Sequence, residues 1–381
     1  MASELARPRL PILTSIRFFA ALHVVLFHLR ATKITFQSGM MGSIAELGYT
    51  GVSLFFVLSG FILVYTYQGR DVPPKQFFRA RFARIYPAYA FSLLLTAPFF
   101  VLGMYVFKAP FLIWSAAHPA VSALSVLALL QAWNPLGALA WNAVAWSLSV
   151  EAFFYTLFPF VLGWFGRRGK SQIFLLLLLF WITSLTVSGG YMLLKPDGLA
   201  SVDSNVLNSP WLNVVKFNPL ARLPEFLLGM CGGMLFLRNS VSRKWATPLV
   251  LGALAAILTV AFFSPAIPYP ILHTGLLSGV FGALIYGFAL GPSWANFLNT
   301  RLLVLFGDAS YSLYLLHQTV LPPFFFRENG RLVHTTVPWI ILAVAVAITV
   351  AIGVFKFIEE PLRRKLNPRR NKSEILQFQP T

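Results

Sequence analysis

Long apolar runs recur along the whole chain, and short polar or basic stretches separate them. Stretches such as 172–194, 246–263 and 337–355 are almost free of charge. An α-helix needs about 20 predominantly apolar residues to cross a bilayer, and these runs approach or reach that length. The pattern therefore predicts membrane-spanning helices rather than the amphipathic elements of a water-soluble core.

We expect an all-α, polytopic transmembrane helix bundle with about ten spans. A further apolar stretch at 119–133 is short for a span, and we predict a re-entrant or outer-surface helix there. The predicted spans lie near 10–30, 49–67, 85–107, 143–165, 172–194, 213–237, 246–264, 271–290, 302–326 and 337–358.

Basic residues predict the orientation of this bundle. They concentrate in loop 68–84, in GRRGK at 166–170, in loop 238–245 and in the C-terminal tail. Loops rich in Lys and Arg face the cytoplasm. The four segments share one side only if 119–133 does not cross the membrane. Both termini are then predicted to be cytoplasmic.

The composition supports a single membrane domain followed by a short tail. Of the 381 residues, 57% are hydrophobic and only 11% are charged, whereas about a quarter of a soluble domain is charged. We expect a single domain over 1–365 and a short basic cytoplasmic tail over 366–381. The net charge of +18 fits cytoplasmic loops and anionic lipid headgroups, not nucleic-acid binding. The single cysteine, Cys231, excludes an intramolecular disulfide.

The first span carries polar residues that lipid disfavours, namely Arg17, His23 and His28. Arg17 and His28 are eleven residues apart, which is three helical turns plus about 20°, so they share one face about 16 Å apart along the axis. His23 lies off that face. Ionisable groups within spans usually mark a functional path. The alternative is a snorkelling arginine and a histidine that is hydrogen-bonded within the bundle.

Two other motifs place polar groups on single helix faces. Arg81 and Arg84 in RFARIYP are three residues apart and are suited to phosphate binding, or else mark topology and contact headgroups. Ser147 and Glu151 in SLSVE are four residues apart. Glu151 is a candidate acid or base, or a partner that orients His28. A structural hydrogen bond between helices is the competing interpretation.

Two further clusters lie in later spans. Arg222 and Glu225 in RLPEF predict a buried, structural ion pair. In GDASYSLYLLHQ, a polar stripe indicates a lined cavity or contacts between helices. The candidate substrate-binding residues of this stripe and of SLSVE are Ser147, Tyr311, Tyr314 and His317. No metal-ligand spacing, Walker loop or dinucleotide fingerprint is present.

Seven of these motifs occur in an order that resembles the acyltransferase-3 family of bacterial integral membrane O-acyltransferases. They are R-x10-H (Arg17, His28), GVSLFFVLSGF (51–61), RFARIYP (Arg81, Arg84), SLSVE (Ser147 to Glu151), RLPEFLLGM (Arg222, Glu225), SYSLYLLH (Ser310 to His317) and FIEEPLRR. The resemblance covers about residues 10 to 365.

The resemblance implies a ten-helix core in the bacterial inner membrane that takes an acyl group, usually acetyl, from cytoplasmic acyl-CoA. The acceptor is a hydroxyl of a glycan, lipid-linked sugar, peptidoglycan or secondary metabolite. By the family motifs, Arg17 and His28 are the essential pair, Arg81 and Arg84 contribute CoA contacts, and Glu151 is the acid of SLSVE. We expect acyl-CoA as a substrate and no permanently bound cofactor. Some relatives carry a fused extracytoplasmic hydrolase-like domain, and we expect this chain to act alone or with a separate extracytoplasmic partner.

Three functions remain open at this stage. The first is acylation of a glycan or lipid-linked saccharide, and the second is acylation of a small natural product such as a macrolide. The third is export of an acylated glycan or lipid. An exporter has no need for a base aligned with a phosphate-binding cation, so Arg17 and His28 favour the enzyme.

Overall fold

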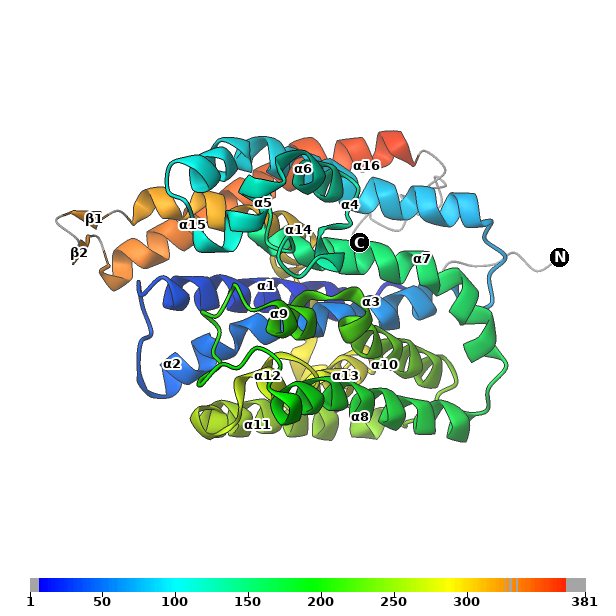
Figure 1. Cartoon of the computed structure of the whole chain (residues 1–381). Coiled ribbons are helices and arrows are strands. Elements are labelled where there is room, and N and C mark those ends of the chain that lie inside the picture. Colours follow the sequence, from blue (N-terminus) through cyan, green and yellow to red (C-terminus); the bar gives the residue numbers. More distant parts are fainter. Residues whose placement is uncertain (1–6, 326, 329–330, 334, 368–381) are drawn as a thin grey trace.

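The computed structural model describes residues 7–325, 327–328, 331–333 and 335–367, and it is almost entirely helical (Figure 1). The basic tail predicted at 366–381 lies outside the described residues from position 368 onward. Two antiparallel strands of two residues each, β1 (Arg327–Glu328) and β2 (Arg331–Leu332), form the only sheet in these described ranges. The prediction of an all-α bundle is confirmed.

The helices follow one another with short connections. The α-helices are α1 (Pro11–Ala31), α2 (Gly39–Glu46), α3 (Gly51–Tyr67), α4 (Pro74–Tyr105), α5 (Ile113–Ala117), α6 (Pro119–Leu127), α7 (Trp146–Gly166), α8 (Lys170–Leu194), α9 (Pro210–Phe217), α10 (Pro219–Leu237), α11 (Ala246–Phe263), α12 (Tyr269–His273), α13 (Ser278–Ala289), α14 (Arg301–Val320), α15 (Val337–Val354) and α16 (Glu360–Leu366). The 3₁₀ turns are η1 (Leu47–Thr50), η2 (Pro110–Leu112), η3 (Gln131–Trp133), η4 (Ala143–Ala145), η5 (Arg243–Trp245), η6 (Ser264–Ala266), η7 (Ser293–Asn299) and η8 (Pro322–Phe324), and η9 (Phe355–Glu359) is π-helical.

Nine helical segments of the described chain are long and apolar enough to cross a membrane. The predicted span at 302–326 corresponds to α14, which is not among the nine because polar side chains interrupt it. Its 20 residues still extend about 30 Å, the thickness of the hydrocarbon core. It packs against α1 on one side and α15 on the other. A polar helix shielded by two apolar helices is the expected wall of an internal cavity.

The structure differs from the sequence prediction at α4, whereas the bend near 119–133 is compatible with the predicted re-entrant helix. We expected a loop over 68–84, but α4 begins at Pro74, because proline is favourable in a first helical turn and no helix breaker follows it before Pro87. The helix therefore carries the basic motif on its first turns. Near 119–133, α5 and α6 meet at a bend of 100°, the geometry of a re-entrant loop or of a broken span.

Burial separates the central helices from the lipid-facing helices. In the segment that contains α3, 83% of the most apolar stretch is buried, against 17% in α8 and 22% in the segment of α11. Figure 1 shows α1 and α3 in the middle of the bundle, with α8 and α11 along one edge. Functional side chains on α1 and α3 therefore point into protein rather than into lipid.

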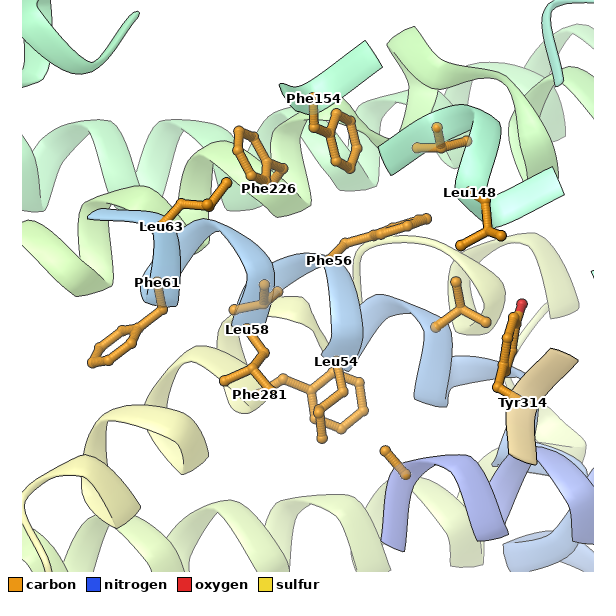
Figure 2. Packing of buried hydrophobic residues seen from close by; sticks show 14 of the residues in the cluster. Leu54, Phe56, Leu58, Phe61, Leu63, Leu148, Phe154, Phe226, Phe281 and Tyr314 are labelled. Carbon is orange, nitrogen blue, oxygen red and sulfur yellow. The ribbon is translucent and has the colours of Figure 1, made fainter. Parts of the chain in front are cut away.

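Glycines allow the central helices to approach closely. A Cβ added at Gly60 of α3 would lie 2.1 Å from the Phe226 carbonyl oxygen of α10. Figure 2 shows Leu63 of α3 extending toward Phe226, with Phe154 of α7 beside Phe226. A Cβ at Gly307 of α14 would lie 2.0 Å from the Thr14 carbonyl oxygen of α1. Small residues at such crossings let backbones meet, and here they bring α1 against α14.

The basic segments gather at one end of the bundle, which we call the basic end. Arg7 donates to the carbonyl oxygen of Gln68 at the end of α3 (2.7 Å), and Arg238 donates to that of Gly166 at the end of α7 (3.2 Å). Figure 1 shows the start of α4, the turn between α7 and α8, and α16 at this same end. The shared side that the sequence predicts for these segments is therefore present.

At the opposite end, Asp197 fixes the start of α9. Its carboxylate accepts hydrogen bonds from the Ser209 hydroxyl and from the backbone N–H groups of Trp211 (3.1 Å) and Leu212 (2.8 Å). Burial opposes ionisation of this group, but the hydrogen bonds outweigh burial and hold the pKa of the Asp197 carboxyl below its usual range.

Candidate active site

A cavity of about 300 Å³ lies between α1, α3, α4, α7 and α14, with α16 at its edge. Four motifs that are far apart in the chain meet in its wall. The predicted site residues that line it are Arg17, Arg81, Arg84, Ser147, Glu151, Tyr311 and Tyr314. The rest of the wall is mostly apolar, from α3 above all. The cavity is therefore a cationic and hydroxyl-bearing space enclosed by hydrophobic helices.

The arginines of the cavity differ in their partners. Arg84 forms an ion pair with Glu359 of η9, and Arg363 of α16, which also lines the cavity, forms one with Glu360. Arg17 makes no hydrogen bond or ion pair with any residue that the structure describes. An arginine beside open volume without an acidic partner is available to an anionic ligand.

Arg81 is the second cavity arginine that has no acidic partner within the described ranges. Its guanidinium donates to the Tyr67 hydroxyl (3.3 Å) and lies over the rings of Tyr67, Phe77 and Tyr155 at 5.6 to 5.9 Å. The aromatic rings hold the guanidinium in place without neutralising its charge. Arg17 and Arg81 thus provide two guanidinium groups in one cavity that form no ion pair within the described ranges, although the carboxylates of Asp308, Glu151 and Glu359 are near enough to Arg17 to interact with its charge.

Glu151 is held by hydroxyl groups. The Tyr155 hydroxyl, one turn further along α7, donates to Oε1, and the Ser59 hydroxyl of α3 donates to the same oxygen (3.2 Å). No hydrogen bond joins Glu151 to His28 among the described residues. The hypothesis that Glu151 orients His28 is therefore wrong for this structure.

Tyr314 and Ser147 lie at the end of the cavity that is nearer to His28 and His317. The Tyr314 hydroxyl lies 2.9 Å from Ser147 Oγ and donates to the Val144 carbonyl oxygen (2.8 Å). Tyr311, one turn earlier on α14, donates to the Ile85 carbonyl oxygen (2.9 Å), and its ring lies beneath Arg84. Both hydroxyl protons already have acceptors, so a ligand can donate to these oxygens but has to replace the existing bonds in order to accept from them.

His28 and His317 lie beyond Tyr314 and are not part of the cavity wall. His28 Nδ1 is 3.1 Å from His317 Nε2, and the Tyr314 ring is 6.2 Å from the His317 ring. Arg17 and His28 both face α14, as the helical phase predicts: Arg17 shares the cavity with Tyr311 and Tyr314, and His28 meets His317. His23 points elsewhere, toward the Ile44 carbonyl oxygen (2.6 Å).

Sequence reasoning missed three site residues, Glu359, Arg363 and Tyr155. Glu359 is completely buried and also accepts a hydrogen bond from Ser312 (2.9 Å). The signal for it was present in FIEEPLRR, where an acidic pair follows an apolar run. Tyr155 lies four residues after Glu151, the spacing that places two side chains on one helix face.

A larger hollow, of about 470 Å³, lies between η2 and the loop that precedes α9. Asp197 is the only ionisable residue in its wall, and its carboxylate is engaged in fixing α9. The hollow offers no base, nucleophile or cation of its own. We therefore place the candidate chemistry in the smaller cavity and at the His28–His317 pair.

Comparison with known proteins identifies the family. The acyltransferase-3 family model, described as an acyltransferase domain, matches residues 11–356. The chain is 30% identical over 336 residues to acyltransferase MdmB of Streptomyces mycarofaciens, which covers 82% of this chain and 79% of MdmB. It is 27% identical over 379 residues to O-acetyltransferase OatA of Staphylococcus aureus, with 93% of this chain covered and only 57% of OatA.

A third relative is similar in length. The chain is 26% identical over 332 residues to the exopolysaccharide production protein ExoZ of Rhizobium meliloti, which covers 85% of this chain and 92% of ExoZ. No solved structure gives a significant match. The family match over nearly the whole chain agrees with the resemblance drawn from the motifs. The chain belongs to the acyltransferase-3 family and is a multi-pass membrane acyltransferase.

Proposed function

We propose that this protein transfers an acyl group, with acetyl the first choice, from cytoplasmic acyl-CoA to a hydroxyl of a glycan or lipid-linked saccharide at the membrane. Both termini are cytoplasmic in this proposal, and the basic end faces the cytoplasm of a bacterial inner membrane. The positive-inside rule supports this orientation, because the basic segments share that end.

The observation that carries the proposal is Arg17. Its guanidinium faces an internal cavity without an acidic partner among the described residues, and Arg81 adds a second charge of this kind. The nucleotide end of CoA bears several phosphate groups, and arginine binds phosphate through paired, charge-assisted hydrogen bonds. Arg84 and Arg363 line the same cavity but are ion-paired with Glu359 and Glu360.

The helix that carries Arg17 also determines the distance that the donor substrate has to span between its phosphates and its thioester. His28 lies about 16 Å further along α1, toward the opposite membrane face. A donor held by its phosphates at Arg17 directs its extended arm and thioester along α1 toward His28. Because Tyr314 and Ser147 close the cavity before His28, Tyr314 has to move aside when the donor enters. His28 then acts as a general base on the acceptor hydroxyl or carries the acyl group itself.

The relatives guide the choice of acceptor. ExoZ is named for exopolysaccharide production and OatA as an O-acetyltransferase. ExoZ matches this chain over 92% of its own length, so the shared part is nearly all of that protein. We therefore propose a saccharide hydroxyl in preference to a small natural product.

Release of free CoA thiol from acetyl-CoA by purified protein tests the proposal. We expect wild type and His23→Ala to release thiol, and His28→Ala to be at least about 100-fold slower, because a positioned acid–base group contributes that much or more. Longer acyl-CoAs serve as alternative donors, and saccharide and macrolide acceptors distinguish the acceptor classes. If no donor is cleaved or bound, export of an acylated product becomes the better hypothesis.

A further inference from the structure

The ring nitrogens of His28 and His317 have specific hydrogen-bond partners. His317 comes from α14, is 1% exposed, and its Nδ1 lies 2.8 Å from the Tyr314 carbonyl oxygen and 3.2 Å from that of Leu313. Its Nε2 lies 3.1 Å from His28 Nδ1. His28 Nδ1 is also 2.9 Å from the Val24 carbonyl oxygen.

These contacts determine the protonation of both rings. A carbonyl oxygen only accepts hydrogen bonds, so an imidazole nitrogen that faces one carries the proton. His317 Nδ1 is therefore protonated, and in the neutral ring Nε2 holds a lone pair. His28 Nδ1 is likewise protonated, and its proton is shared between Val24 and His317 Nε2 in a three-centre hydrogen bond.

The remaining nitrogen of His28 is free. His28 Nε2 has no hydrogen-bond partner among the described residues, and it is not one of the enclosed, unpaired polar atoms of the protein. In the tautomer that the contacts require, this nitrogen carries the lone pair. The two backbone carbonyls of α14 and the one of α1 thus leave Nε2 as the basic nitrogen of His28.

We infer that His317 is the positioning residue of the transfer reaction: it holds His28 in the Nδ1–H tautomer, with the Nε2 lone pair available to the acceptor hydroxyl. This inference rests on the proposed function for its reaction and on the geometry alone for the tautomer. It assigns to His317 a role different from the substrate contact predicted from sequence, since His317 is buried and bonded to His28.

The reaction that follows from this arrangement balances without another reactant. As the acceptor oxygen attacks the thioester carbon, a C–O bond forms and His28 Nε2 takes the hydroxyl proton. The C–S bond then breaks, and the CoA sulfur leaves with the proton returned from Nε2. The products are an ester and free CoA thiol. His317 remains neutral and stabilises the transient His28 imidazolium through the Nδ1–H bond.

A neutral partner suits this depth in the membrane. A carboxylate in the place of His317 would bury a formal charge within the bundle, which is costly at membrane depth. A neutral imidazole provides a hydrogen-bond acceptor without a formal charge. The acids nearest to the cavity, Glu151 and Glu359, are instead bound to Tyr155 and Arg84.

The test uses ¹⁵N-histidine-labelled protein in lipid bilayers and reads tautomers by NMR. The chain has six histidines, and loss of one signal in His28→Gln assigns His28. We expect Nδ1–H for His28 and Nε2–H for His23, whose Nε2 faces the Ile44 carbonyl, so His23 is an internal control. In His317→Ala, we expect part of His28 to shift to the Nε2–H tautomer, with His23 unchanged.

Activity measurements complete the test. We expect kcat for thiol release to fall about 100-fold in His317→Ala with KM for acetyl-CoA nearly unchanged, because the base and not the donor site is altered. His317→Gln should retain most activity, since its amide can donate to a carbonyl and accept from His28.

An unchanged His28 tautomer in His317→Ala overturns the inference, whether kcat falls or not. Retained kcat in a folded His317→Ala protein also overturns it. If wild type cleaves no acyl-CoA but shows the expected tautomers and their dependence on His317, the proposed function fails and the positioning of His28 stands.

Discussion

Two arginines within the bundle, Arg222 and Arg17, show opposite uses of a buried charge. Arg222 of α10 is 0% exposed and is surrounded by partners: Glu225 at 2.9 Å, Ser53 at 2.8 Å and the His273 carbonyl oxygen at 3.0 Å. Its guanidinium also lies over the Phe56 and Trp146 rings. Arg17 of α1 lines a cavity instead and forms no hydrogen bond or ion pair with the described part of the chain.

This difference separates structural from functional charge in the membrane. Glu225 neutralises Arg222, and Ser53 bonds both groups, so the cluster joins α3, α10 and α12. Within the described ranges, Arg17 makes no hydrogen bond or ion pair that joins helices together. The charges of Asp308, Glu151 and Glu359 act on it from a distance, and water or an anionic ligand in the cavity offsets its desolvation further. Position in a span does not distinguish the two arginines, whereas the identity of their neighbours does.

The largest effect that this comparison predicts is on folding, in Arg222→Ala. Removal of one partner leaves Glu225 as an uncompensated buried charge, which costs about 3–5 kcal/mol. Cys231 is the single cysteine and is fully buried, so the temperature at which a thiol-reactive fluorophore labels it reports unfolding. We expect a clear fall in this midpoint, or loss of folded protein.

The Arg222–Glu225 ion pair can be replaced as a whole as well as broken by removal of one partner. In Arg222→Leu with Glu225→Leu, no isolated charge remains, and part of the lost stability should return. A wild-type midpoint in Arg222→Ala would show that the cluster does not stabilise the fold.

The matching prediction for Arg17 is on activity. Arg17→Ala should leave the Cys231 labelling midpoint close to wild type and lower kcat/KM for acetyl-CoA about 10- to 100-fold, the value of one hydrogen bond to a charged group. The loss should appear mainly in KM if Arg17 holds the phosphates. Arg17→Lys should recover part of the affinity, because it keeps the charge without the paired donors. Full activity in Arg17→Ala would remove the observation on which the proposed function rests.

Both arginine sites depend on close helix contacts, and Gly307 tests the one between α1 and α14. An added methyl group would lie 2.0 Å from the Thr14 carbonyl oxygen, so the helices must separate at a cost of about 1–3 kcal/mol. Gly307→Ala should lower the labelling midpoint and weaken the His28–His317 contact, with reduced thiol release.

Gly252→Ala in α11 is the matched control. Nothing lies within 4 Å of the added Cβ there, and alanine favours a helix by up to about 1 kcal/mol over glycine. Equal effects of the two substitutions would show that helix propensity, not the α1–α14 contact, governs the result.

These contrasts show where sequence reasoning succeeds. The apolar runs predict the helices, and the 3.6-residue period places Arg17 and His28 on one face of α1, which does meet α14. The spacing of Arg222 and Glu225 predicts their ion pair, which is present at 2.9 Å. Each of these properties is local, because it depends on residues within one helix.

The partners between helices are not local and were harder to predict. The sequence offers Glu151 as one possible partner of His28, but in the structure His28 contacts His317, because the Gly307 crossing sets which turns of α1 and α14 meet. Arg84 likewise finds Glu359, 275 residues later in the chain. Nothing in either motif specifies such a pairing.

The smallest predicted effect concerns a charge outside the spans, Asp197. Its carboxylate accepts two backbone N–H bonds at the start of α9, and Asp197→Asn should cost about 0.3–1 kcal/mol at neutral pH, because it removes a negative charge from a helix N-terminus. Because the folded-state pKa of Asp197 is lowered, its contribution is fully present above the unfolded pKa, about 4. The contribution of Asp197 to stability is lost as the pH falls through its folded-state pKa.

Thermal unfolding of wild type and Asp197→Asn, followed by intrinsic tryptophan fluorescence, measures this effect. The two midpoints should differ at pH 7 and converge as the pH is lowered below 4. A constant difference across this range would mean that the Asp197 charge is not what fixes α9. The effect at Asp197 is expected to be smaller than the effects at Arg17 and Arg222 because Asp197 lies outside the spans. Water solvates a charge at the membrane surface, so such a charge requires neither a full set of protein partners nor a cavity.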